Sequence, residues 1–226
     1  MLNVYIGFDP REAVAFYTLA HSILERSSIP VSIAPLMRGQ LRSLYWRERG
    51  PTESTEFSMT RFLVPALSEY RGWSLYMDCD MLCRADIAEL AARTHVEREK
   101  AVLVCKHEYV PKTERKFLDQ IQTRYARKNW SSLMLFNNER CRALTPDYVN
   151  SASGLDLHRF AWTDDAAIGA LPLEWNWLVG EYDYHAGAKI VHYTIGGPYF
   201  DAYRSCDYAG EWFAEFESMR QCASSG

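Results

Sequence analysis

WSLYMDCDM, residues 73–81, is a short apolar run that leads directly into two aspartates separated by one residue. Such a run predicts a buried strand in a mostly parallel α/β sheet. Open sheets of this kind bind ligands beyond the carboxyl ends of their strands, where Asp78 and Asp80 fall. Residues i and i+2 of an extended chain point the same way, so both carboxylates can converge on one divalent cation. For an isolated DxD pattern, a solvated turn after the strand is the alternative.

The composition fits a single α/β domain over residues 1–226. Of these residues 48% are apolar, enough for a large core. The formal net charge of −4 argues against a nucleic-acid partner, which would need a basic face. There is no apolar run of membrane-spanning length, and the six cysteines form no CxxC pair. We therefore expect a cytoplasmic protein with reduced cysteines and no transmembrane segment.

Strand and helix patterns alternate along the chain. Strands are expected at 2–8, 31–36, 73–77, 101–106, 130–136 and 189–192, and helices at 11–26, 57–67, 86–90 and 208–222. Residues 107–128 are basic and aromatic, and they are expected to form either a solvated face or a border of the ligand-binding cleft at the carboxyl ends of the strands. The helix at 208–222 is expected to pack on the core, with peripheral membrane contact as the alternative.

Polar residues at the ends of the predicted strands are further candidates for a site. Asp9 ends the first strand and is expected either to receive a base or ribose or to cap the following turn. Arg61 is a cation one short element before the DxD strand. His192 ends the last strand and precedes Gly196 and Gly197, whose backbone amides could approach phosphates closely.

An acidic pair, Asp164 and Asp165, leads into a loop rich in proline and tryptophan. Loops positioned on a scaffold tend to carry function, so this segment is a site candidate. The ring faces of Trp175 and Trp177 suit stacking on sugars, with core packing expected for at least one of them.

In the order of its motifs the chain resembles GT-A glycosyltransferases, most closely the glycogenin-like group, glycosyltransferase family eight. The resemblance runs from VYIGFD (4–9) to HYTIGGPY (192–199) and includes FSMTRF (57–62), the DxD and WSSLMLFN (130–137). It implies a GT-A, Rossmann-like fold with a mostly parallel sheet flanked by helices. It also implies sugar transfer, with retention of configuration, from a nucleotide sugar (a UDP-sugar) to a hydroxyl acceptor.

The resemblance also assigns roles to individual residues. Asp78, Asp80 and His192 would hold Mn²⁺ or Mg²⁺ with the donor diphosphate. Asp164 and Asp165 would be the catalytic pair that orients the sugars, one of them serving as the base if the enzyme inverts. With the candidates above, the expected substrate-binding residues are Phe8, Asp9, Arg61, Lys106, Ser131, Ser132, Trp175, Asn176, Gly196 and Gly197.

Two positions depart from the family pattern. Gly197 stands where the family has the lysine of its final loop, so Lys106, Arg61 or Lys128 would have to supply that charge. Trp130 stands where the family usually has asparagine. The acceptor stays open among a glycan, a lipid-linked glycan and a small molecule. Two other classes also stay open: a phosphohydrolase of the haloacid dehalogenase type, and a non-catalytic nucleotide- or carbohydrate-binding module.

Overall fold

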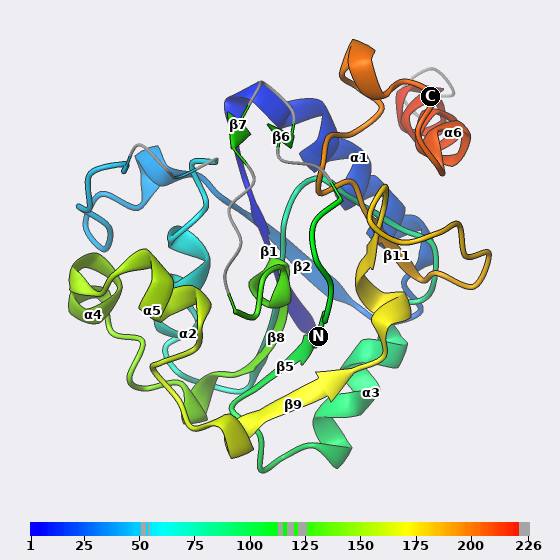
Figure 1. The fold of residues 1–226 in the computed structure, drawn as a ribbon. Helices are drawn as coiled ribbons and strands as arrows, with labels where there is room; N and C mark the ends of the chain where they lie inside the picture. The colour runs from blue at the N-terminus through cyan, green and yellow to red at the C-terminus, as the bar shows by residue number, and fades with distance from the viewer. Residues whose placement is uncertain (51–52, 54, 113–114, 117–119, 122–125, 222–226) are drawn as a thin grey trace.

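The computed structural model describes residues 1–50, 53, 55–112, 115–116, 120–121 and 126–221, and its centre is a six-stranded sheet (Figure 1). The strand order is β2-β1-β3-β8-β5-β9. These strands are β1 (Leu2–Gly7), β2 (Val31–Leu36), β3 (Trp73–Met77), β5 (Val102–Cys105), β8 (Leu133–Asn137) and β9 (Ile168–Leu171). Of these strands only β8 runs antiparallel to its neighbours, so the predicted mostly parallel α/β sheet is confirmed.

The central strands are apolar along their whole length because both faces of the sheet are covered. Every residue of β5 and β8 is buried, and so are the last four residues of β3. A strand covered on both faces gains from apolar side chains at every position, which explains the continuous runs in the sequence. The buried edge that follows β3 is where the two aspartates emerge.

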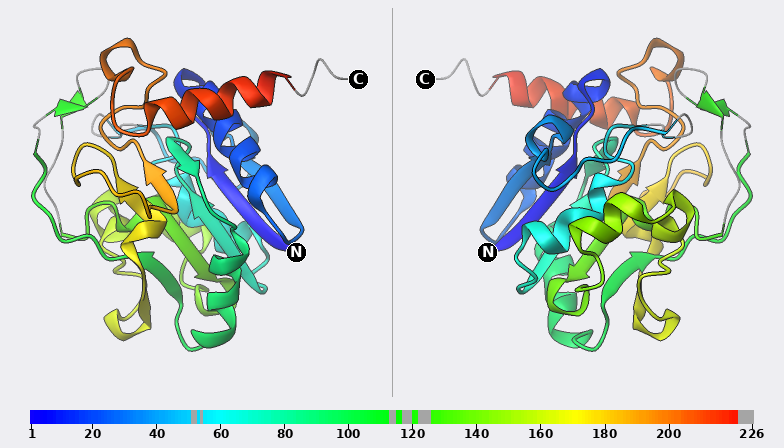
Figure 2. Two further views of the ribbon diagram at one scale, coloured as in Figure 1. Left: turned by 90° about the vertical axis from the view of Figure 1, so that its right-hand side faces the viewer. Right: turned by 90° about the vertical axis from the view of Figure 1, so that its left-hand side faces the viewer.

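Helices α1 (Ala13–Arg26) and α6 (Ala209–Gln221) pack against one another beside the sheet (Figure 2). Between them the buried Glu215 accepts a hydrogen bond from Arg26 at 2.6 Å and pairs with His21 at 2.5 Å. The aromatic face of α6 lies in a second apolar cluster in which Trp212 is buried. The expectation that this helix packs on the core is therefore confirmed.

The helix expected over residues 57–67 is interrupted. The structure has a 3-10 turn, Thr60–Leu63, followed by the single-turn helix α2 (Val64–Leu67). Pro65 has no N–H and its ring crowds the preceding turn, so it fits the first turn of a helix but not the middle of one. The other helices are α3 (Ala88–Val96), α4 (Pro146–Ser151) and α5 (Gly154–His158).

A smaller sheet, in the order β10-β11-β4, stands beside the main one. Its strands are β10 (Trp177–Leu178), β11 (Ile190–His192) and β4 (Met81–Cys83). Strand β4 follows directly after the two aspartates, and His192 pairs with Met81 in the antiparallel β4–β11 ladder. This register carries the histidine to the aspartates across a long separation in sequence. A short hairpin, β6 (Arg115–Lys116) and β7 (Gln120–Ile121), falls within the basic segment 107–128, part of which lies outside the described residues.

Four cysteine thiols are buried and unoxidised: Cys79, Cys83, Cys105 and Cys141. Burial raises the pKa of Cys79 well above its usual range, because a thiolate would lose its hydration there. Among the helices of the described part of the chain, none has the length and apolarity needed to cross a membrane.

Candidate metal centre

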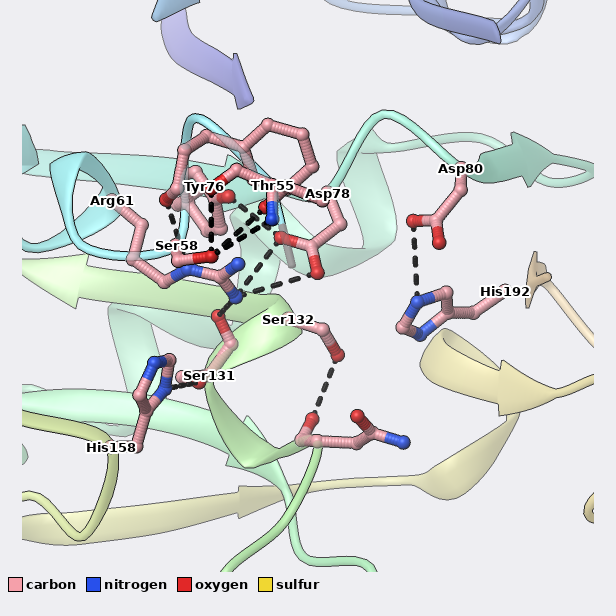
Figure 3. A network of polar contacts seen from close by, with 12 residues as sticks. Thr55, Ser58, Arg61, Tyr76, Asp78, Asp80, Ser131, Ser132, His158 and His192 are labelled. Carbon is pink, nitrogen blue, oxygen red and sulfur yellow. Dashed lines mark hydrogen bonds and ion pairs between the residues drawn. The ribbon is translucent and has the colours of Figure 1, made fainter. Parts of the chain in front are cut away.

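Asp78, Asp80 and His192 come together beyond the carboxyl end of β3 (Figure 3). One ligand atom from each side chain lies within 4.8 Å of the others, and all three residues are buried. The family resemblance predicted that these three residues act together, and the β4–β11 register explains why they converge. Two carboxylates and an imidazole in one buried place are a typical donor set for a divalent cation.

Asp78 is held by a cation and a phenol. Arg61 lies with Nη1 3.0 Å from Asp78 Oδ1, and Tyr76 donates its hydroxyl proton to the same oxygen at 2.6 Å. Burial raises the pKa of Asp78, while the Arg61 charge opposes that rise and Asp80 adds to it. The Arg61 guanidinium, 6% exposed, also donates to the carbonyl of Ser131 at 2.8 Å. Arg61 is thus a fixed counter-charge for the first aspartate.

Asp80 faces the imidazole. Its Oδ1 lies 3.3 Å from His192 Nε2, and among the described residues this buried oxygen accepts no hydrogen bond. A buried carboxylate oxygen without a donor is costly unless a cation lies beside it. The geometry therefore fits a metal ion bound between Asp78, Asp80 and Nε2 of His192.

The second nitrogen of His192 is engaged from the opposite side. Asn176, fully buried, places its Oδ1 2.9 Å from His192 Nδ1. Asn176 was expected to bind substrate, and in the structure both ends of its amide are hydrogen-bonded within the protein. Metal-binding histidines generally have such a partner on the nitrogen that does not bind the metal, where it fixes the ring orientation.

Ser131 and Ser132 lie beside this cluster at the start of β8. The backbone carbonyl of Ser132 accepts a hydrogen bond from the backbone N–H of Asp78 at 2.9 Å. The hydroxyl of Ser132 lies 2.8 Å from the Asn176 amide nitrogen. The hydroxyl of Ser131 pairs with Nδ1 of the partly buried His158 at 2.7 Å. Both serines are nearly fully buried and hydrogen-bonded within the protein. Their contacts support the cluster.

The first turn after β1 holds Asp9 as a cap. Its carboxylate accepts the backbone N–H groups of Arg11, at 3.0 Å, and Glu56, at 3.2 Å, and it pairs with the Arg11 guanidinium. These hydrogen bonds lower the pKa of Asp9 against the effect of burial. Of the two roles expected for Asp9, the cap is the one the geometry shows. Phe8 is half-buried and packs edge-on against Phe16.

The acidic pair Asp164 and Asp165 is not brought to the cluster. Both side chains are exposed and precede the amino end of β9, whereas Asp78 and Asp80 follow the carboxyl end of the parallel strand β3. Asp165 is 79% exposed and pairs with Arg127 at 2.6 Å. The structure therefore gives no support to their expected catalytic role, because neither carboxylate lies among the converging groups.

The packing bears on three further candidates. Trp175 is 4% exposed within the main core, in line with the expectation that at least one of the two tryptophans packs there. Lys106 donates to the Ile168 carbonyl at 2.8 Å and lies over the Trp130 ring. A Cβ added at Gly196 or Gly197 would overlap a tyrosine ring, at 2.4 and 2.2 Å, so close ring packing explains both glycines without a phosphate.

Sequence reasoning missed Tyr76, His158 and Asn129 as parts of this network. The phenol of Tyr76 could have been found, because it lies two residues before Asp78 on the same side of β3. Nothing local marks His158, which reaches Ser131 from the end of α5. Asn129 shows no motif either, yet it has a left-handed φ of 62° and its carbonyl accepts from Ser132.

Several solved structures that align with this chain are described as glycosyltransferases. The bifunctional glycosyltransferase WbbM aligns with a TM-score of 0.65 at 15% identity over 95% of this chain, which spans 49% of that chain. The galactosyltransferase LgtC, solved with donor and acceptor sugar analogues, aligns with a TM-score of 0.57 at 12% identity over 96% of both chains. The fold is therefore the GT-A fold, as predicted.

A curated plant protein is similar to this chain over most of its length. Protein CDI of Arabidopsis thaliana is 46% identical over 228 residues, which cover 97% of this chain and 87% of the plant protein. The chain belongs to the family of Protein CDI. No family model matches the sequence.

Proposed function

We propose that this protein is a metal-dependent glycosyltransferase that moves a sugar from a nucleotide sugar, a UDP-sugar, to a hydroxyl acceptor. The observation that carries the proposal is the buried Asp78–Asp80–His192 cluster at the carboxyl edge of a GT-A sheet. The glycosyltransferase titles of the structural neighbours support it. The glycogenin-like family eight and the donor class follow from the motif order and remain part of the proposal.

Each residue of the cluster has a defined task in this proposal. Asp78, Asp80 and His192 would hold Mn²⁺ or Mg²⁺, which supplies charge neutralisation for the departing diphosphate. Arg61 pairs with Asp78 at 3.0 Å and opposes the rise in the Asp78 pKa that burial causes. Asn176 orients His192 through Nδ1. Retention of configuration is proposed because the resemblance implies it and the acidic pair Asp164–Asp165 stands apart from the cluster.

A phosphohydrolase of the haloacid dehalogenase type would use Asp78 as a nucleophile. Asp78 Oδ1 accepts a hydrogen bond from the Tyr76 hydroxyl and pairs with Arg61, and both contacts reduce its nucleophilicity. The structure thus favours a ligand role for Asp78. Glycosyl transfer remains the better-supported function.

The test is a ligand screen followed by a turnover assay. The melting temperature is measured with a panel of nucleotides and UDP-sugars, with and without Mn²⁺, because a ligand that binds only the native state must raise it. Release of UDP is then measured for wild type, Asp80→Asn and, as the matched control, Asp164→Asn. A metal-dependent shift and turnover lost only in Asp80→Asn are expected. Binding without turnover would favour a binding module, and no shift with any nucleotide would contradict the proposal.

A further inference from the structure

A chain of buried polar groups runs from His192 away from the metal cluster. Asn176 Oδ1 lies 2.9 Å from His192 Nδ1, and Asn176 Nδ2 lies 2.8 Å from the hydroxyl of Ser132. That hydroxyl lies 2.7 Å from the carbonyl oxygen of Asn129, which is also 3.4 Å from Asn176 Nδ2. The chain therefore ends on a backbone carbonyl, a group that can only accept.

The terminal carbonyl determines which group donates in each hydrogen bond along this chain. The Asn129 carbonyl accepts, so Ser132 must donate its one hydroxyl proton to it. The lone pairs of Ser132 then accept from Asn176, which places the amide NH₂ on that side and Oδ1 toward His192. Because Oδ1 can only accept, Nδ1 of His192 carries the ring proton. In the neutral ring, the unprotonated nitrogen is then Nε2, the one that faces Asp80 at 3.3 Å.

Asn129 is itself anchored. Its backbone has a φ of 62° and a ψ of 3°, a left-handed conformation that asparagine tolerates better than most residues. Its side-chain amide donates to Tyr109 Oη at 2.7 Å and to Thr194 Oγ1 at 3.3 Å. Thr194 stands two residues after His192, so the anchor ties the start of β8 to the loop that follows the histidine.

We propose that Ser132 and Asn129 are positioning residues that set the tautomer of His192. They keep the Asn176 amide in one orientation, which presents the Nε2 lone pair to the metal. The inference rests on the proposed function in one respect, since a bound cation is what uses that lone pair. Without the Ser132 hydroxyl, the amide loses its short anchor and can turn its NH₂ toward the histidine, which moves the ring proton to Nε2.

The test compares four variants in metal-free and Mn²⁺-titrated protein under mildly alkaline conditions, where histidine rings are neutral. Ser132→Ala removes the anchor, and Asn129→Gly keeps the left-handed backbone but removes the side-chain tie. Asn176→Asp, combined with Ser132→Ala, replaces the amide by a carboxylate that accepts from Nδ1 whichever way it turns. Ser74→Ala is the control, because Ser74 is equally buried but bonds to Ser68 and Asn138. Histidine ring ¹⁵N NMR reports the tautomer, and calorimetry reports Mn²⁺ affinity.

Ser132→Ala is expected to populate the Nε2–H tautomer and to lose about 10–100-fold in Mn²⁺ affinity, because it releases the Asn176 amide, and losing the hydrogen-bond partner of a metal-binding histidine usually has an effect of this size. Asn129→Gly should show a smaller loss of the same kind, the double variant should recover affinity, and Ser74→Ala should match wild type. The inference is overturned if folded Ser132→Ala and Asn129→Gly both keep the wild-type tautomer. If wild type itself binds no Mn²⁺, the proposed function fails, while the NMR spectrum still decides the tautomer.

Discussion

Replacing Asp80 with asparagine is expected to stabilise the metal-free protein and to abolish its response to Mn²⁺. In the absence of metal, Asp80 brings a negative charge close to Asp78, and its buried Oδ1 accepts no hydrogen bond within the described residues. The asparagine side chain would carry no charge and could donate to His192 Nε2 across the present 3.3 Å contact. The substitution therefore removes a repulsion and satisfies a buried group at the same time.

The expected size follows from the separation of the charges. Two like charges about 4–5 Å apart repel by roughly 3–4 kcal/mol at an effective dielectric constant near 20. Arg61 compensates part of this, so we expect a gain of about 2 kcal/mol in the free energy of unfolding. For a domain of this size each kcal/mol raises the melting temperature by about 2–4 °C, which gives about 4–8 °C. Mn²⁺ at about 100 times its dissociation constant should stabilise wild type by about 2.7 kcal/mol, and this increment should vanish in the variant.

Thermal unfolding with and without Mn²⁺ measures both effects. Asp164→Asn is the matched control, because it makes the same change at an exposed carboxylate outside the cluster. It should shift the melting temperature little and keep the wild-type response to Mn²⁺. A drop in the metal-free melting temperature of Asp80→Asn, or a retained Mn²⁺ response, would refute the reasoning that Asp80 exists to bind a cation.

Three further outcomes are expected. Burial, with Arg61 and Arg47 nearby, lowers the pKa of His158 to about 3, whereas the same residue in the unfolded chain takes up a proton below about pH 6.5. The free energy of unfolding should therefore fall by about 1.4 kcal/mol between about pH 7.5 and 5.5. Chemical denaturation should show that this loss is smaller in His158→Gln. Arg61→Met, which leaves Asp78 buried without its cation, should cost about 3–5 kcal/mol by urea denaturation; an unchanged midpoint would contradict the pairing. Trp175→Ala should cost about 3–5 kcal/mol in the same assay, whereas a residue that only stacks on sugar would cost little.

The strand-end position of Asp78 and Asp80 and the main sheet could be predicted from sequence because their signals are local. An apolar run followed by alternating aspartates is readable within a few residues, and it placed Asp78 and Asp80 correctly at a strand end. Linking His192 to them required the family resemblance, because the cause is a β4–β11 register that no local pattern contains. The antiparallel insertion of β8 between β3 and β5 was likewise invisible in a strand that reads as apolar throughout.

Residue type alone could not place Asp164, Asp165 and Trp175, because the same side chains serve on surfaces and in cores. Asp165 pairs with Arg127 at the surface, and Trp175 fills space beneath Lys189. Asn176 was noticed beside the tryptophans, but its task depends on which hydroxyl and which ring nitrogen it meets. Burial and partner identity arise from the tertiary arrangement and leave no mark at single positions.

Cys79 lies between the two aspartates with its thiol fully buried and its pKa raised. Alkylating reagents attack thiolates, so this sulfur should react only when the edge of the sheet opens. Its labelling rate therefore reports how often the segment that joins β3 to β4 comes apart while the rest of the protein stays folded. If Asp78 and Asp80 hold a cation as proposed, its binding should slow the labelling of Cys79, because the cation would join both ends of this segment.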